Sequence, residues 1–166
     1  MTTSRATTGT DGRHDFDFLH GTWRVALRRL ADPLRPDVPD WADFEALLWA
    51  RPLLGGLGNV ESISGTGGVD FDGATLRLFD PGTRTWRIWW ASTSAAGRLD
   101  PPMEGRFDGP SGRFFGRDTV RGTAVDLRFD WHVDGPDTAR WAQAFSFDGG
   151  ASWSENFTMR FTRTGA

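Results

Sequence analysis

The chain has 166 residues, a formal net charge of −3 and no cysteine, which excludes disulfides, thiolate metal sites and a cysteine nucleophile. Its 22 acidic and 19 basic residues are mixed along the sequence, which argues against a nucleic-acid partner. No apolar run approaches the roughly 20 residues of a membrane-spanning helix, so we expect no membrane partner. The absence of cysteine makes a cytoplasmic location the default expectation. Nine tryptophans and thirteen phenylalanines require a large apolar interior or a ligand on which to stack.

The chain is expected to form one domain preceded by a tail. Residues 1–13 are polar and lack the apolar core and cleavage site of a secretory signal, so they are predicted to be a disordered tail. Residues 14–166 have the length of a single domain with one core. Within it, Asp15–His20 predicts a short helical turn, and Gly21–Leu30 predicts the first strand. The proline-rich segment that follows, Ala31–Asp40, predicts a surface loop.

The segment from Trp41 to Pro52 has two competing patterns. Trp41, Phe44 and Leu48 have helical spacing, and acidic residues stand where they would cap a helix. Apolar residues also alternate from Phe44 to Ala50, as in a strand. We therefore predict one helical turn over residues 40–43 and a strand after it.

The remainder of the chain reads as short strands separated by Gly- and Pro-rich turns. In the hairpin formed by residues 74–79 and 85–92, Leu76 and Leu78 are expected to face Trp86, Ile88 and Trp90. The other predicted strands are 58–64, 103–107, 113–119, 124–133, 139–147 and 153–163.

About ten antiparallel strands with one helical turn at the start predict an all-β fold. Tight turns alternate with longer loops along the chain, so one end would be closed and the other open. This asymmetry favours a single up-and-down antiparallel barrel that holds a small molecule.

The first strand carries a motif that supports this fold. Gly21-Thr22-Trp23 resembles the G-x-W signature of the calycins, the superfamily of lipocalins and fatty-acid-binding proteins. The resemblance implies a calycin-like barrel in which a helical turn precedes Trp23, Trp23 plugs the closed end, and Arg163 of the last strand packs across it. The chain also resembles a group of uncharacterised bacterial calycin-like barrel proteins, in Asp15–Trp23, Arg51–Gly58 and Gln143–Asn156. That group implies a fold and a cavity, and no reaction.

A second motif spans Ser146–Trp153 and fits the Asp-box pattern known from sialidase propellers. The pattern encodes a β-hairpin in which Asp148 caps backbone N–H groups of the turn and Trp153 packs beneath it. It occurs once in a chain too short for a propeller, so it predicts structure at Asp148 and Trp153 and gives no support to glycosidase activity.

Two polar residues interrupt the apolar faces of the last two strands. Gln143 and Glu155 are expected to point inward and to meet across the hairpin, with Glu61 as another inward carboxylate. Such a carboxylate either belongs to an internal ion pair that fixes the register of the strands, or it serves a ligand or a proton transfer. The predicted ligand-binding residues are Trp86, Trp90, Phe114, Trp131, Gln143, Phe145, Glu155 and Phe157.

The three histidines, His14, His20 and His132, have no metal-ligand spacing, so we expect no metal site. A haem-binding branch of the calycin-like barrels uses a histidine late in the chain, and none follows His132, so neither haem nor another cofactor is predicted.

Three functions remain open. The first is binding of a small, largely apolar molecule in the barrel. The second is an enzyme of the isomerase or cyclase type in secondary metabolism, with Glu155 or Glu61 moving a proton. The third is a protein-interaction module that uses Trp49 and Trp89 on the outer surface. The sequence leaves the oligomeric state undetermined.

Overall fold

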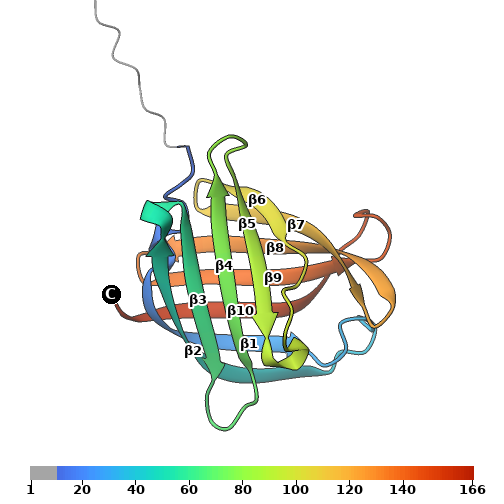
Figure 1. Cartoon of the computed structure of the whole chain (residues 1–166). Coiled ribbons are helices and arrows are strands. Elements are labelled where there is room, and N and C mark those ends of the chain that lie inside the picture. The colour runs from blue at the N-terminus through green and yellow to red at the C-terminus, as the bar shows by residue number, and fades with distance from the viewer. Residues whose placement is uncertain (1–10) are drawn as a thin grey trace, which may run out of the picture.

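The computed structural model describes residues 11–166, which fold into one closed antiparallel barrel of ten strands (Figure 1). Each strand pairs with its neighbours along the chain, and β1 pairs with β10 to close the barrel, which confirms the predicted fold. The strands are β1 (Gly21–Leu30), β2 (Trp41–Leu53), β3 (Gly58–Gly65), β4 (Asp72–Asp80), β5 (Thr85–Ser92), β6 (Met103–Asp108), β7 (Ser111–Val120), β8 (Thr123–Gly135), β9 (Thr138–Ser146) and β10 (Ser154–Gly165). The helical segments are the 3₁₀ turns η1 (Asp17–Leu19), η2 (Leu54–Gly56) and η3 (Thr93–Ala95). No helix in the described residues is long and apolar enough to span a membrane.

The N-terminal part of the described chain is attached to the barrel. Most of the predicted tail lies outside the described residues, which begin at Asp11. The carbonyl of Gly12 accepts a hydrogen bond of 2.9 Å from Nε1 of Trp86. The last three residues of the expected tail are therefore held against β5.

β2 is a strand along its whole length, so the predicted helical turn over residues 40–43 is wrong. Trp41 pairs with Leu30 and Ala42 with Arg29, which places the backbone polar groups of this segment in the ladder with β1. From Phe44 onward the alternate side chains face the interior, as the period-two pattern predicted. Pairing with β1 outweighs the local capping signal.

The face of β4 that turns inward is also the opposite of the predicted one. Thr75 and Arg77 are buried inside the barrel, while Leu76 and Leu78 lie half-buried on its outer surface. The register explains this orientation, because Thr75 lies opposite Glu61 of β3 and shares its face. The alternation of β4 was predicted correctly, but the leucines were assigned to the inner face and lie on the outer one.

Trp23 and Arg163 close one end of the barrel. Gly21 has a φ of +117°, and a Cβ there would lie 2.6 Å from the carbonyl oxygen of Gly165, so glycine is required at the first position of the motif. The expected contact between Trp23 and Arg163 is present, with the guanidinium carbon 4.2 Å from the ring centroid. Arg163 also donates from Nη1 to the carbonyl of His20 at 2.6 Å, which ties β10 to the end of η1.

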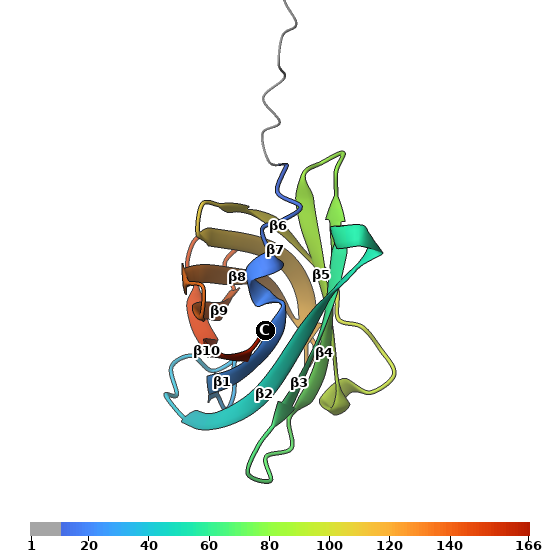
Figure 2. The same cartoon turned by 90° about the vertical axis from the view of Figure 1, so that its left-hand side faces the viewer.

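A phenylalanine from the N-terminal turn fills the barrel behind this closure. In Figure 2 the turn that contains η1 lies across one end of the barrel. Phe16 is fully buried, and its ring lies within 6 Å of the rings of Trp86, Phe107, Phe114 and Trp131. These rings form a packed plug at the closed end.

The hairpin between β9 and β10 is shaped by Asp148. Its carboxylate accepts a hydrogen bond from the backbone N–H of Ser152 at 2.8 Å and another from the hydroxyl of Ser146 at 2.8 Å. Hydrogen bonds from the side chain and backbone of Ser152 lower the pKa of Asp148 to about 2. Trp153 packs outside the barrel, where the guanidinium of Arg128 lies 4.9 Å from its ring centroid. In this geometry both Asp148 and Trp153 are parts of the turn.

Candidate functional site

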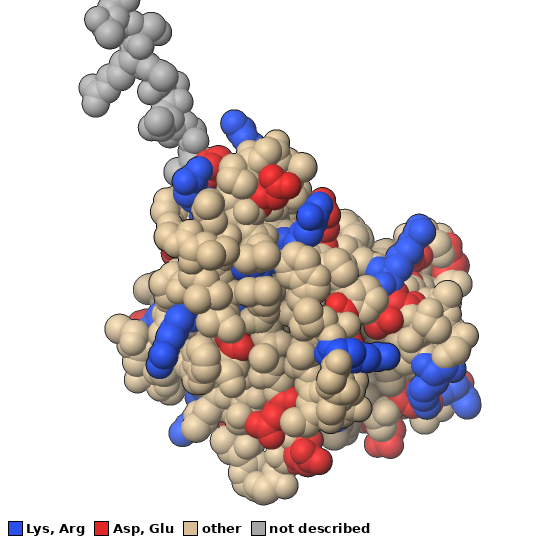
Figure 3. Space-filling view, in the orientation of Figure 1, with Lys and Arg blue, Asp and Glu red and all other residues tan. Residues whose placement is uncertain are grey.

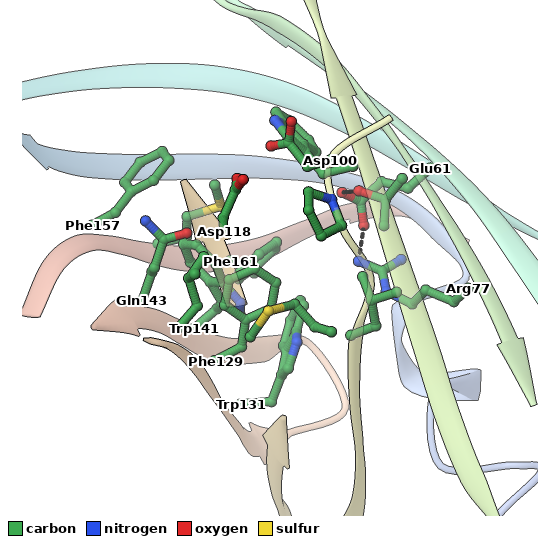
Figure 4. A pocket seen from close by; sticks show the side chains of 17 residues that line it. Glu61, Arg77, Asp100, Asp118, Phe129, Trp131, Trp141, Gln143, Phe157 and Phe161 are labelled. Carbon is green, nitrogen blue, oxygen red and sulfur yellow. Dashed lines mark hydrogen bonds and ion pairs between the residues drawn. The ribbon is translucent and has the colours of Figure 1, made fainter. Parts of the chain in front are cut away.

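A cavity of about 110 Å³ lies inside the barrel, between the Phe16 plug and the open end (Figure 4). A water molecule needs only roughly 10–15 Å³ by the same measure, so the space exceeds that of a single trapped water. Apolar side chains form most of its wall. The six aromatic residues among them, from β5, β8, β9 and β10, are Trp90, Phe129, Trp131, Trp141, Phe157 and Phe161.

One side of the cavity is formed by a buried ion pair between β3 and β4. Nη2 of Arg77 lies 2.6 Å from Oε2 of Glu61, and the two side chains are 3% and 7% exposed. Thr75 donates to Oε1 of Glu61 at 3.1 Å, and Nη1 of Arg77 donates to Oδ1 of Asn59 at 3.0 Å. The guanidinium also lies 4.9 Å from the ring centroid of Phe16. The charge of Glu61 is therefore already compensated, and its oxygens are engaged by Arg77 and Thr75.

The side of the cavity nearest the open end carries hydrogen-bond acceptors. Asp118 points inward from β7, and Asp100 reaches the cavity from the loop after η3. Burial raises the pKa of Asp100, the negative charge of Asp118 adds to this effect, and Arg98 opposes it. Gln143 of β9 completes this polar group.

Two donors near the other end of the cavity have no partner. Nε1 of Trp131 and Nε of Arg77 are both buried and make no hydrogen bond within the described structure. A buried donor without a partner costs about 1–3 kcal/mol, so such groups call for an explanation. Because Trp131 lines the cavity, a hydrogen-bond acceptor on a bound molecule could satisfy its N–H.

No family model matches the chain, and no curated protein matches its sequence. Among solved structures, EF1p2_mFAP2b bound to DFHBI is similar to it, with a TM-score of 0.49 and 13% identity, over 92% of this chain and 99% of that one. A DUF3598-family protein of unknown function from Nostoc punctiforme is also similar, with a TM-score of 0.27 and 9% identity. That match spans 92% of this chain and 99% of the other. Both TM-scores are below 0.5, so neither likeness bears on function, and the cavity itself must provide the evidence.

The predicted ligand-binding residues fall into three groups in the structure. Trp90, Trp131, Gln143 and Phe157 line the cavity together. Phe145 lies in an adjoining, more open cavity of about 270 Å³ at the mouth of the barrel. The remaining three residues do not line the cavity. Trp86 and Phe114 belong to the Phe16 plug, and Glu155 lies elsewhere.

Glu155 is exposed on the outer surface, so its predicted position inside the barrel is wrong. A β-bulge explains the error, because Glu155 pairs with Ala144 while Phe157 pairs with Gln143, which leaves Asn156 as an extra residue. One extra residue reverses the faces of a strand. Asn156 is buried instead and accepts a hydrogen bond of 2.8 Å from Nε2 of Gln143.

Several residues of the cavity were missed by the sequence patterns. Arg77 alternates with Thr75 and Phe79, but the neighbouring leucines suggested the opposite phase. Asp118 lies four residues after Phe114 on β7, so alternation could have placed it on the inner face. Asp100 lies in a loop, where no periodicity indicates the direction of its side chain.

Proposed function

We propose that the protein binds a small, largely apolar molecule in the interior cavity. The observation that carries the proposal is a space of about 110 Å³ surrounded by six aromatic side chains inside a closed barrel. Protein cores normally pack with few voids larger than a water molecule. Side chains around such a space lack packing partners on one side. A bound molecule would restore the missing contacts.

The enzyme alternative has less support from the positions of its candidate residues. Glu61 is engaged by Arg77 and Thr75, and Glu155 lies outside the barrel. Neither carboxylate is placed to accept a proton from a molecule in the cavity, so an isomerase or cyclase would need Asp100 or Asp118 as its base.

The third alternative, an interaction module, concerns the outer face over β2 to β5. Trp49 is 38% exposed there, and Trp89 is half-buried. Uncharged side chains cover much of the surface over β3 and β4 in Figure 3. This face gives no indication of the partner that would cover it, so binding inside the barrel remains the better-supported function.

We further propose that the barrel is calycin-like. The helical turn before Trp23 and the packing of Arg163 across that ring support this assignment.

Native mass spectrometry of protein purified from its own host tests the binding function. We expect the wild type to retain a small molecule that denaturation releases. Leu127→Trp should fill the cavity and abolish retention, because Leu127 lines it. Leu76→Trp makes the same change on the outer surface and should retain the molecule. Equal retention by the wild type and Leu127→Trp, or retention by neither wild type nor variant, would contradict the proposal.

A further inference from the structure

We infer that the molecule held in this cavity carries a positively charged nitrogen, such as a protonated amine, that lies beside Asp118, Asp100 and Gln143. The inference rests on the proposed binding function and adds the chemical class of the ligand. Figure 4 shows these three side chains among those that line the cavity.

The carboxylate of Asp118 lacks the compensation that Glu61 has. Among residues 11–166 no basic side chain lies within ion-pair distance of Asp118, whose Oδ1 accepts only the backbone N–H of Thr119 at 2.7 Å. Asp100 is 3.7 Å from Arg98, a side chain that is 64% exposed. Burial disfavours the charge of Asp100, and a cationic ligand beside these two carboxylates would compensate it.

Gln143 adds a neutral acceptor to these two carboxylates. Its Nε2 donates to Oδ1 of Asn156 at 2.8 Å, so its amide carbonyl is left to face the cavity. Figure 4 shows the oxygen of Gln143 on the side toward Asp118. All three polar groups at this end therefore accept hydrogen bonds, which matches a donor-rich ammonium group.

The charge of the approach to the cavity is also negative. The adjoining cavity at the mouth is lined by four carboxylates and one guanidinium, which are Asp70, Asp72, Asp100, Asp118 and Arg29. The guanidinium of Arg29 is within 6 Å of the ring centroids of Phe44, Phe71 and Phe157. An excess of one sign of charge along a cleft attracts ions of the opposite sign.

The remaining walls fit the same chemistry. The rings of Trp90 and Trp141 can stabilise a cation by cation–π contact, and together with Phe157 they offer area for a flat apolar body. An anionic ligand would find no free cation deeper in the cavity, because Arg77 is paired with Glu61. The unpartnered N–H of Trp131, a side chain only 4% exposed, would instead meet a neutral acceptor on the ligand.

Isothermal titration calorimetry with three probes of matched shape tests this inference. The probes are naphthylmethylamine, which is cationic at neutral pH, naphthylmethanol, which is neutral, and naphthylacetate, which is anionic. We expect the amine to bind about tenfold more tightly than the alcohol or better, and the acetate to bind most weakly. The advantage of the amine should shrink at high salt.

Asp118→Asn should lower the affinity ratio of amine to alcohol severalfold, and the double variant Asp100→Asn/Asp118→Asn should bring this ratio close to one. Asp108→Asn is the matched control, because it removes the same charge from an exposed turn at the closed end. Equal binding of amine and alcohol by the wild type, or tightest binding of the acetate, would overturn the inference and leave the proposed binding function standing. If none of the probes binds although the wild type retains a molecule in native mass spectrometry, the inference alone is overturned. If no probe binds and the wild type also retains no molecule, the proposed function is refuted, and the inference with it.

Discussion

Breaking the buried ion pair between Glu61 and Arg77 is expected to destabilise the barrel strongly, because one charge would remain buried without its partner. Replacing Glu61 with glutamine keeps the shape of the side chain and removes its charge. The guanidinium of Arg77 would then remain in a site where it is only 3% exposed, without its carboxylate. Breaking a buried pair in this way costs about 3–5 kcal/mol, and the glutamine oxygen, as a remaining acceptor, places the expected loss near 3 kcal/mol. Urea denaturation measures this loss as a change in the free energy of unfolding.

The structure provides a matched control for this experiment. Glu104 of β6 pairs with Arg87 of β5 at 3.0 Å and also accepts from a threonine hydroxyl, but both charged side chains are nearly half exposed. Glu104→Gln should therefore cost less than about 1 kcal/mol. The double variant Glu61→Leu/Arg77→Met, which leaves no unpaired charge, should lose less stability than Glu61→Gln alone. Equal losses for Glu61→Gln and Glu104→Gln would refute the reasoning that burial makes the first pair important.

Three further predictions concern the closed end and the last hairpin. Phe16→Ala should lower the free energy of unfolding by about 3–5 kcal/mol in urea denaturation, because the ring is fully buried in the plug; a loss below 1 kcal/mol would mean that the plug collapses without strain. Arg163→Lys should cost about 2–4 kcal/mol, since lysine cannot both stack on Trp23 and donate in a fork to the carbonyls of η1; an unchanged melting temperature would contradict this. The pKa of Asp148 is lowered to about 2, so its contribution to stability is present above the unfolded-state pKa near 3.8 and is lost as the pH falls toward 2. Asp148→Asn should flatten that part of the stability profile, and identical profiles from pH 2 to pH 6 would exclude the effect.

Sequence patterns predicted the barrel well because each strand alternates and each tight turn has its own local chemistry. The strand pairs follow from those local signals, whereas the contact of Trp23 with Arg163 was expected from the resemblance of Gly21-Thr22-Trp23 to the calycin signature. An alternating strand can, however, turn either of its two sets of side chains toward the core. A prediction from sequence chooses between the two sets by hydrophobicity alone. On β4 the leucines favoured the wrong phase, because the burial of Arg77 depends on Glu61 of another strand.

The errors within the candidate site have equally local causes. The bulge at Asn156 leaves no signature in the composition of β10, yet it moves Glu155 to the outer surface. Trp86 and Phe114 point inward as expected but lie too far toward the closed end, because Phe16 fills the space between them and the cavity. Alternation gives the side of the sheet on which a residue lies and does not give its depth along the barrel.

Occupancy of the cavity is the central claim, and a crystal structure of the protein purified from its own host tests it most directly. We predict electron density for a small molecule in contact with Trp90, Trp141 and Phe157, with a nitrogen beside Asp118. Side chains that fill this space, or a ligand bound instead on the outer face at Trp49 and Trp89, would contradict the claim.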